Sequence, residues 1–258
     1  MSEHEQIVGI ISAKNRTPLE LDPRCTALLV VDMQRYFTQP SFPFTDVFEK
    51  LSPGSAAGYL TRVRQTVIPS IQRLLNSFRA AGSPVVFTAV GTETGDGREL
   101  PCWLRSFDEL GMAILGKRVW PAVDDPSWAI DDALTPLPGE VVLNKLSAGT
   151  FATTGLEQRL RHQRIENVVV TGVSTDVCVT TTSREAADRG FKTIVVSDGC
   201  TTLSDTMHRA SLETFNLAFG WVRTANEVVA LLATVPRPAN NSLPAANDAA
   251  RTARLISR

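Results

Sequence analysis

The sequence contains little histidine and no long apolar run. Only three histidines occur among 258 residues, so a histidine-rich metal site or a Ser-His-Asp triad has little material to draw on. The longest apolar runs hold about five residues, whereas a membrane-spanning helix needs about 20. The N-terminal residues show no basic segment followed by an apolar block, so we expect no secretion signal and a cytoplasmic protein.

Charge and cysteine content exclude further classes of protein. The chain has 26 basic and 27 acidic side chains and a formal net charge of −1, which argues against nucleic-acid binding by a polybasic surface. The four cysteines form no CxxC pair, so neither a zinc ribbon nor a thioredoxin motif is present. We expect free thiols. Cys25, Cys102 and Cys200 are interpreted as structural, and Cys200 is the only competitor of Cys178 as a nucleophile.

Short apolar runs alternate with helical patterns along the chain. The expected strands are 26–31, 84–89, 140–143, 167–171, 192–197 and a weaker 220–223. The expected helices are 67–81, 156–163, 177–189, 205–219 and 225–233. This alternation requires crossover connections. It predicts an α/β fold, a three-layer αβα sandwich with a mostly parallel, about six-stranded Rossmann-like sheet.

The domain organisation follows from composition. Residues 1–24 are polar and read as an N-terminal arm, 25–235 as the domain, and 236–258 as a flexible C-terminal tail. Residues 90–139 are too long for a simple connection and are predicted to form a lid or subunit contact. Pro69 is tolerated only in the first turn of a helix, so the helix that contains it should begin near Val67.

Three reactive side chains follow three of the predicted strands: Asp32, Lys145 and Cys178. Ligands of open parallel sheets bind at the carboxyl ends of the strands, so these groups should meet. Cys178 would lie at a helix N-terminus, where the dipole favours a thiolate. A carboxylate can accept its proton, and an ammonium can hold both anions. The trio therefore predicts nucleophilic catalysis.

Each of these residues also has a plain structural interpretation. Asp32 could cap a helix, Lys145 could be a solvated loop lysine, and Cys178 could be a small buried hydrophobe. Lys145 gains weight because the chain has five lysines against 21 arginines. A dinucleotide-binding oxidoreductase would need GxGxxG after the first strand, and no glycine follows Asp32 there. A non-enzymatic protein of this fold would be expected to lack part of the trio.

The segments around these residues resemble the isochorismatase-like cysteine hydrolases over about residues 25–233. They are Val30-Val-Asp32-Met-Gln34, Lys145 with Gly149-Thr-Phe151, Thr171-Gly-Val-Ser-Thr-Asp-Val-Cys178 and Ala187-Asp-Arg-Gly-Phe191. The stretch 140–190 is most similar to the biuret hydrolase branch, with ureidoacrylate and N-carbamoylsarcosine amidohydrolases close to it.

The resemblance implies a catalytic triad of Asp32, Lys145 and Cys178, a cis peptide between Val173 and Ser174, and an oxyanion hole of the Ser174 and Cys178 backbone N–H groups. It implies hydrolysis of a C–N bond in a small linear amide, of ureido or N-carbamoyl (biuret-like) type, through a thioester with release of ammonia. Alternatives within the superfamily are an isochorismatase-type activity or hydrolysis of another small amide.

Cofactors, partners and pocket residues complete the expectation. Nicotinamidases carry an aspartate and histidines for a metal after the second strand, and residues 89–97 contain no histidine, so we expect no metal, no cofactor and full activity after chelation. The resemblance implies a small-molecule amide partner and a homodimer or homotetramer, without nucleic acid or membrane. Candidate substrate-binding residues are Gln34, Phe37, Trp120, Phe151 and Asn216.

Overall fold

The predicted α/β fold is confirmed by the computed structural model, which describes residues 6, 9 and 18–233. Its sheet is parallel throughout, with the strand order β3-β2-β1-β4-β5-β6. The strands are β1 (Thr26–Val31), β2 (Val85–Val90), β3 (Val141–Lys145), β4 (Asn167–Val173), β5 (Lys192–Thr201) and β6 (Trp221–Arg223). The order reverses direction between β1 and β4, which is where such sheets bind ligands.

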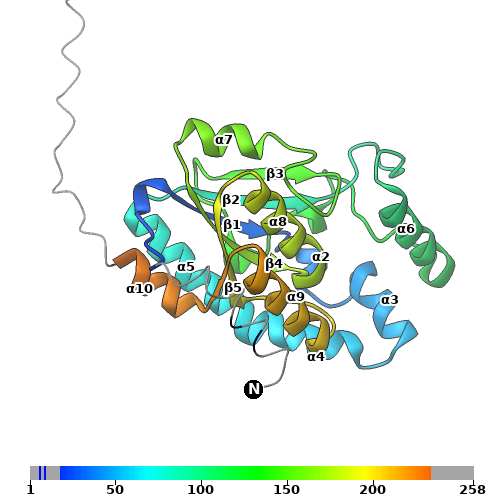
Figure 1. Ribbon diagram of the computed structural model, residues 1–258. Helices are drawn as coiled ribbons and strands as arrows, with labels where there is room; N and C mark the ends of the chain where they lie inside the picture. The colour runs from blue at the N-terminus through cyan, green and yellow to red at the C-terminus, as the bar shows by residue number, and fades with distance from the viewer. Residues whose placement is uncertain (1–5, 7–8, 10–17, 234–258) are drawn as a thin grey trace, which may run out of the picture.

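Helices cover both faces of the sheet and produce the three layers (Figure 1). On one face, α5 (Ile68–Ala81) and α10 (Ala225–Ala233) share a core with Leu28 and Val30 of β1. On the other face, α7 (Leu156–His162), α8 (Thr180–Asp188) and α9 (Asp205–Ala218) share a core with Leu29 and Val31. Every residue of β1 is buried. Burial on both faces explains why its sequence is continuously apolar rather than alternating.

Four helices had no counterpart in the sequence interpretation. They are α2 (Arg35–Thr38), α3 (Pro43–Leu51), α4 (Ser55–Arg62) and α6 (Cys102–Leu115). α6 contains Gly111 in its interior. A Cβ atom on Gly111 would lie 2.6 Å from Val119 Cγ2 and 2.8 Å from the Lys117 carbonyl oxygen. This glycine therefore permits close packing of the following chain against the helix and does not end it.

The predicted helix start near Val67 agrees with the first residue of α5, Ile68, but the helical chain before it was not predicted. The chain is already helical from Ser55, and a π-helical turn at Val63–Val67 joins α4 to α5. In that turn the Ile68 N–H donates to the Val63 carbonyl. Pro69 then falls within the first turn of α5, where its missing N–H breaks no helical bond. The proline is thus accommodated by a local change of helix type.

The predicted tail at 236–258 lies outside the described residues, as does most of the 1–24 arm. No helix among the described residues is long and apolar enough to cross a membrane. The 90–139 segment connects β2 to β3, and its helix α6 packs beside α3 at one side of the molecule (Figure 1). This connection matters for function because it builds one wall of the cavity described below.

Candidate active site

The local backbone places Asp32 directly beyond the end of β1. Asp32 has a φ of +53°, a conformation uncommon for a residue with a side chain. Beside it, Gly172 has a φ of +116°, and a Cβ atom there would lie 1.9 Å from the Val31 carbonyl oxygen. Only glycine permits this approach of β4 to β1. The close contact brings the loop after β4 against Asp32.

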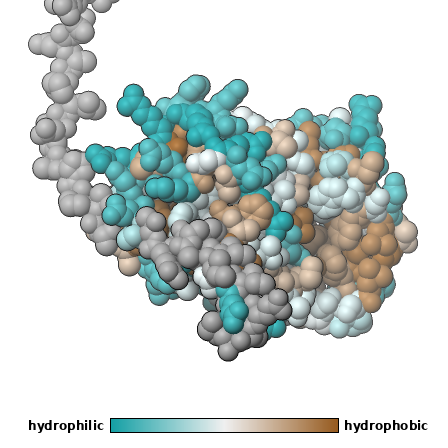
Figure 2. Space-filling view, in the orientation of Figure 1, coloured by the Kyte–Doolittle hydropathy of each residue, from teal (hydrophilic) through white to brown (hydrophobic). Residues whose placement is uncertain are grey.

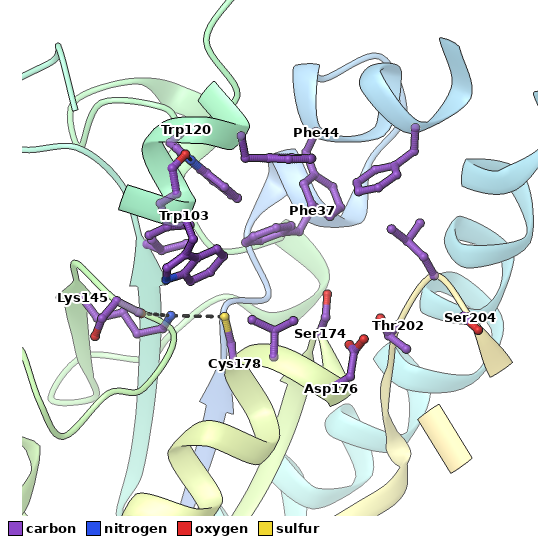
Figure 3. Close-up of a pocket in the computed structure, with 17 residues that line it drawn as sticks. Phe37, Phe44, Trp103, Trp120, Lys145, Ser174, Asp176, Cys178, Thr202 and Ser204 are labelled. Carbon is purple, nitrogen blue, oxygen red and sulfur yellow. Dashed lines mark hydrogen bonds between the residues drawn. The ribbon is translucent and has the colours of Figure 1, made fainter. Parts of the chain in front are cut away.

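The three predicted catalytic side chains come together at this edge of the sheet. Figure 3 shows two of them, Lys145 and Cys178. Lys145 Nζ lies 2.9 Å from Asp32 Oδ2 and 3.4 Å from Cys178 Sγ. The same ammonium donates a 2.7 Å hydrogen bond to the Ser147 carbonyl oxygen. Asp32 and Lys145 are fully buried, and Cys178 is 8% exposed. The ammonium therefore bridges the carboxylate and the sulfur in a dry environment.

Hydrogen bonds orient the Asp32 carboxylate. Thr88 Oγ1 donates a 2.7 Å bond to Oδ1, while the Asp32 N–H donates to the Thr88 carbonyl at 3.1 Å. Oδ2 faces Lys145 and, within the part of the chain that the structure describes, receives no other hydrogen bond from an N–H or O–H group. One oxygen is thus held by the neighbouring strand, which leaves the other available to accept a proton.

The thiolate expected from the helix N-terminus is not favoured. Burial raises the pKa of Cys178, the Lys145 ammonium lowers it and the Asp32 carboxylate raises it, with a net value of about 12. Burial lowers the pKa of Lys145, but the charges of Asp32 and Cys178 outweigh this effect and raise it. At neutral pH the resting site therefore holds a thiol beside an ammonium. The expectation of a thiolate considered the helix dipole and omitted the burial of the sulfur, which has the largest effect on the pKa of Cys178.

The loop that carries the nucleophile has a distinctive backbone. The peptide between Val173 and Ser174 is cis, at the position implied by the resemblance. Cys178 lies in a π-helical turn at Thr175–Val179, in which the Val179 N–H donates to the Ser174 carbonyl at 3.1 Å. This turn leads directly into α8.

The other cysteines lie away from this arrangement. Cys102 is exposed at the start of α6 and Cys25 is half-buried next to β1. Cys200 is buried in β5, and burial raises the pKa of its thiol to about 12. None of the three lines the cavity that contains Cys178.

Cys178 opens into a cavity of about 310 Å³. One side of it is aromatic, formed by Phe37, Phe44, Phe48, Trp103, Phe107 and Trp120. The opposite side is polar, with Ser174, Asp176, Thr202 and Ser204 (Figure 3). The volume falls at the lower end of small-molecule sites, roughly 300–1,000 Å³. The sulfur is therefore accessible to a small substrate.

Two of the five predicted substrate-binding residues, Phe37 and Trp120, line this cavity. The other three predicted residues, Gln34, Phe151 and Asn216, do not line it. The Gln34 amide is fully buried and hydrogen-bonded to the backbone of Val90 and Trp128. Phe151 packs in the core beneath α8, and Asn216 accepts a hydrogen bond from the Val222 N–H. The Gln34 and Asn216 side chains are partners of neighbouring backbone groups, and the Phe151 ring fills the apolar core.

The sequence interpretation missed several wall residues that a helical pattern would have indicated. Phe44 and Phe48 are four residues apart on α3, as are Trp103 and Phe107 on α6. Residues at this spacing share one helix face. Asp176 stands two positions before the nucleophile, inside the segment that carried the resemblance, and its side chain reaches the cavity.

The position after β2, where nicotinamidases carry a metal, holds hydrogen-bonded side chains. Glu99 accepts bonds from the Thr92 hydroxyl at 2.7 Å and the Glu93 N–H at 2.6 Å, and also from the Thr94 hydroxyl. Among the described residues, no group of three or more histidine, cysteine, aspartate or glutamate side chains could hold a metal ion.

Comparison with known proteins agrees with this architecture. The family description "Isochorismatase domain" matches residues 26–227. Ureidoacrylate amidohydrolase RutB of Methylobacterium radiotolerans is 32% identical over 228 residues, covering 83% of this chain and 82% of that protein. The corresponding protein of Stutzerimonas stutzeri is 29% identical and covers 93% and 99%.

Solved structures show the same relationship. A cysteine hydrolase from Pseudomonas syringae pv. phaseolicola superposes with a TM-score of 0.67 at 27% identity, covering 84% of this chain and 98% of that one. N-carbamoylsarcosine amidase from Thermoplasma acidophilum shares the fold, with a TM-score of 0.56 at 24% identity over 78% and 96%. The chain therefore belongs to the isochorismatase family and is a hydrolase with the isochorismatase-like fold.

Proposed function

We propose that this protein is a cysteine-dependent amidohydrolase that cleaves the C–N bond of a small linear amide and releases ammonia. The substrate is a simple amide or a compound with a ureido or N-carbamoyl group. The observation that carries the proposal is the contact of Lys145 Nζ with both Asp32 Oδ2, at 2.9 Å, and Cys178 Sγ, at 3.4 Å, on the wall of a cavity. The relatives named ureidoacrylate amidohydrolase support this reaction class.

The raised pKa of Cys178 assigns the first step to Asp32. The thiol is protonated at neutral pH, so the Asp32 carboxylate takes its proton as sulfur attacks the carbonyl carbon. A tetrahedral oxyanion forms. The backbone N–H groups of Ser174 and Cys178 stabilise it, and the Lys145 ammonium compensates the charge on sulfur. Burial of the Cys178 thiol is an advantage here, because the proton leaves the sulfur only when a substrate carbonyl is present for the sulfur to attack.

The remaining steps return the proton. The tetrahedral intermediate collapses, the C–N bond breaks, and protonated Asp32 delivers its proton to the nitrogen, which leaves as ammonia. A thioester of Cys178 remains. Asp32 then takes a proton from water, the hydroxide adds to the thioester, and the C–S bond breaks as the sulfur recovers its proton. The products are one carboxylic acid, or a carbamic acid from a ureido substrate, and one ammonia.

An isochorismatase-type reaction is the second candidate, and Cys178 speaks against it. Hydrolysis of a vinyl ether needs no cysteine nucleophile. The position of the sulfur, between an ammonium and the open cavity, therefore favours C–N cleavage.

Ammonia release from amide and ureido compounds tests the proposal. We expect Cys178→Ser and Cys178→Ala to lower kcat/KM by roughly 10³-fold or more, as for other enzymes that lose their nucleophile. Mass spectrometry after an acid quench should show an acyl adduct on Cys178 in the wild type. Full ammonia release by folded Cys178→Ala protein would refute a cysteine mechanism.

The proposal includes a homodimer or homotetramer, as the family resemblance implies. Size-exclusion chromatography with light scattering, at the concentration used for activity, measures the oligomer. A monomer with full activity would contradict this part and leave the chemistry unaffected.

A further inference from the structure

The electrostatic character of the cavity bears on the substrate. Among the described residues that line it, Lys145 is the only one with a cationic side chain, and that ammonium already contacts Asp32, Cys178 and the Ser147 carbonyl. A substrate carboxylate would therefore find no free cation on these walls. Burying a carboxylate without a partner costs several kcal/mol.

The polar side of the cavity carries a negative charge instead. Asp176 lines it together with Ser174, Thr202 and Ser204 (Figure 3). The Oδ1 atom of Asp176 is buried and has no hydrogen-bond partner among the residues that the structure describes. Because a buried polar atom normally has a partner, the Asp176 carboxylate, which lines the cavity, has a capacity to accept hydrogen bonds that the described residues leave unused.

Charged groups next to the polar side of the cavity have partners of their own and do not cancel the negative charge of Asp176. Arg62 lies outside the cavity lining, pairs with Asp205 at 3.2 Å and donates to the Thr202 carbonyl at 2.8 Å. His208 bonds Thr175 through Nδ1 at 2.9 Å. Burial is the main cause that lowers the pKa of His208, which keeps it neutral at neutral pH.

The other side of the cavity is aromatic and continues to the surface. Phe44 and Trp120 pack with centroids 6.4 Å apart, and Phe107 lies 5.6 Å from Trp120. Trp103 is 48% exposed. Figure 2 shows apolar side chains gathered on the side of the molecule that carries α6 and α3. An apolar group beside the reacting carbonyl would be desolvated against this wall.

We propose that the cavity selects amides or ureas that bear an apolar group and no carboxylate, and that Asp176 is the specificity-determining residue, which accepts an N–H of the substrate and repels anions. This inference rests on the proposed amidohydrolase function. An acrylate carries a carboxylate, so the expected preference departs from the substrate in the relatives' name.

Matched substrates that differ only in the distal group test the inference. The amide series is hexanamide, 6-aminohexanamide and adipic acid monoamide, and the ureido pair is pentylurea and 5-ureidopentanoic acid. We expect kcat/KM for ammonia release to be at least about tenfold lower for each carboxylate than for its neutral partner, and undiminished for the ammonium compound. We call the ratio of kcat/KM between each neutral compound and its carboxylate partner the carboxylate penalty. Asp176→Asn keeps the shape of the side chain and should reduce this penalty to about threefold or less.

A matched control separates local from general charge effects. Asp188→Asn removes the same charge from an exposed position at the far end of α8 and should leave the penalty at its wild-type value. A wild-type enzyme that prefers the carboxylates, or a penalty that Asp176→Asn does not change, would overturn the inference while ammonia release still supports the proposed function. Absence of Cys178-dependent ammonia release from all five compounds would count against both.

Discussion

At the scale of single residues, the reactivity of the thiol depends on two opposite charges. Asp32 raises the pKa of Cys178 and Lys145 lowers it, on a background of burial that raises it to about 12. A nucleophile held as a neutral thiol reacts only slowly with other electrophiles before substrate arrives. This explains why the carboxylate sits beside the sulfur although it opposes thiolate formation.

The two charges can be separated by alkylation. Asp32→Asn leaves the ammonium beside the sulfur, lowers the pKa of Cys178 and should speed alkylation by iodoacetamide at pH 7–8, by about tenfold for each pKa unit. Lys145→Met leaves the carboxylate and should slow alkylation. Both variants should lose amide hydrolysis, because the proposed mechanism needs Asp32 for proton transfer and the Lys145 ammonium to compensate the charge on sulfur. The rate is measured by mass spectrometry, with Cys178→Ala to identify other labelled thiols.

In the wild type, the alkylation rate should keep rising with pH through pH 9, because only the minor thiolate form reacts. A rate that levels off near pH 7, or one that Asp32→Asn lowers, would show that the thiolate is already the resting form.

At the scale of elements, helix α8 holds the loop that follows Lys145. The Glu185 carboxylate accepts a 2.9 Å hydrogen bond from the Phe151 N–H, and a Cβ atom on Gly149 would lie 2.3 Å from that carboxylate. The same loop provides the Ser147 carbonyl that receives the Lys145 ammonium. The helix that begins at the nucleophile thereby positions the lysine.

Removing this connection should impair catalysis without touching the substrate. We expect Glu185→Ala to lower kcat by about tenfold and the free energy of unfolding by about 1–3 kcal/mol, because a backbone N–H loses its partner. Glu185→Gln keeps an acceptor oxygen and should recover most of kcat. Ammonia-release kinetics and urea unfolding measure both effects. Equal losses of kcat in the two variants would argue against a positioning role.

At the scale of the whole molecule, carboxylates fasten the long connection between β2 and β3. Burial raises the pKa values of Glu99, Asp131 and Glu140, but hydrogen bonds and charges lower them by more. The largest lowering effect is a side-chain hydrogen bond, from Thr94 to Glu99, from Thr38 to Asp131 and from Arg79 to Glu140. For Glu99 the pKa falls from 4.5 to about 2. The connection builds the aromatic wall of the cavity, so its attachment also determines the shape of the site.

Acid should loosen this attachment. A folded-state pKa below the unfolded one stabilises the fold fully above the unfolded pKa, and the contribution disappears as pH falls through the folded pKa. We therefore expect the free energy of unfolding to fall from about pH 4.5 towards pH 2. Urea unfolding at several pH values should show the difference between wild type and Glu99→Gln shrinking over this window. A difference that stays constant would show that Glu99 is not involved.

The alternation of strands and helices, the parallel sheet and the three residues of the proposed triad could be predicted from the sequence alone. Continuous apolar strands and reactive residues at their ends are local patterns, and the topology of a parallel sheet then brings those ends to one edge. Asp32, Lys145 and Cys178 could be identified for this reason, together with Phe37 and Trp120 of the cavity wall.

Only the tertiary structure decided the protonation of the thiol, the character of the cavity and the roles of Gln34, Phe151 and Asn216. These properties depend on burial and on contacts between segments far apart in the chain. Burial and the charge of Asp32 outweigh the Lys145 ammonium and raise the pKa of Cys178, and the aromatic wall exists only because α3 and α6, distant in sequence, pack together. The burial of a side chain and the charges around it are sums over its neighbours in space, and the order of residues along the sequence does not contain those neighbours.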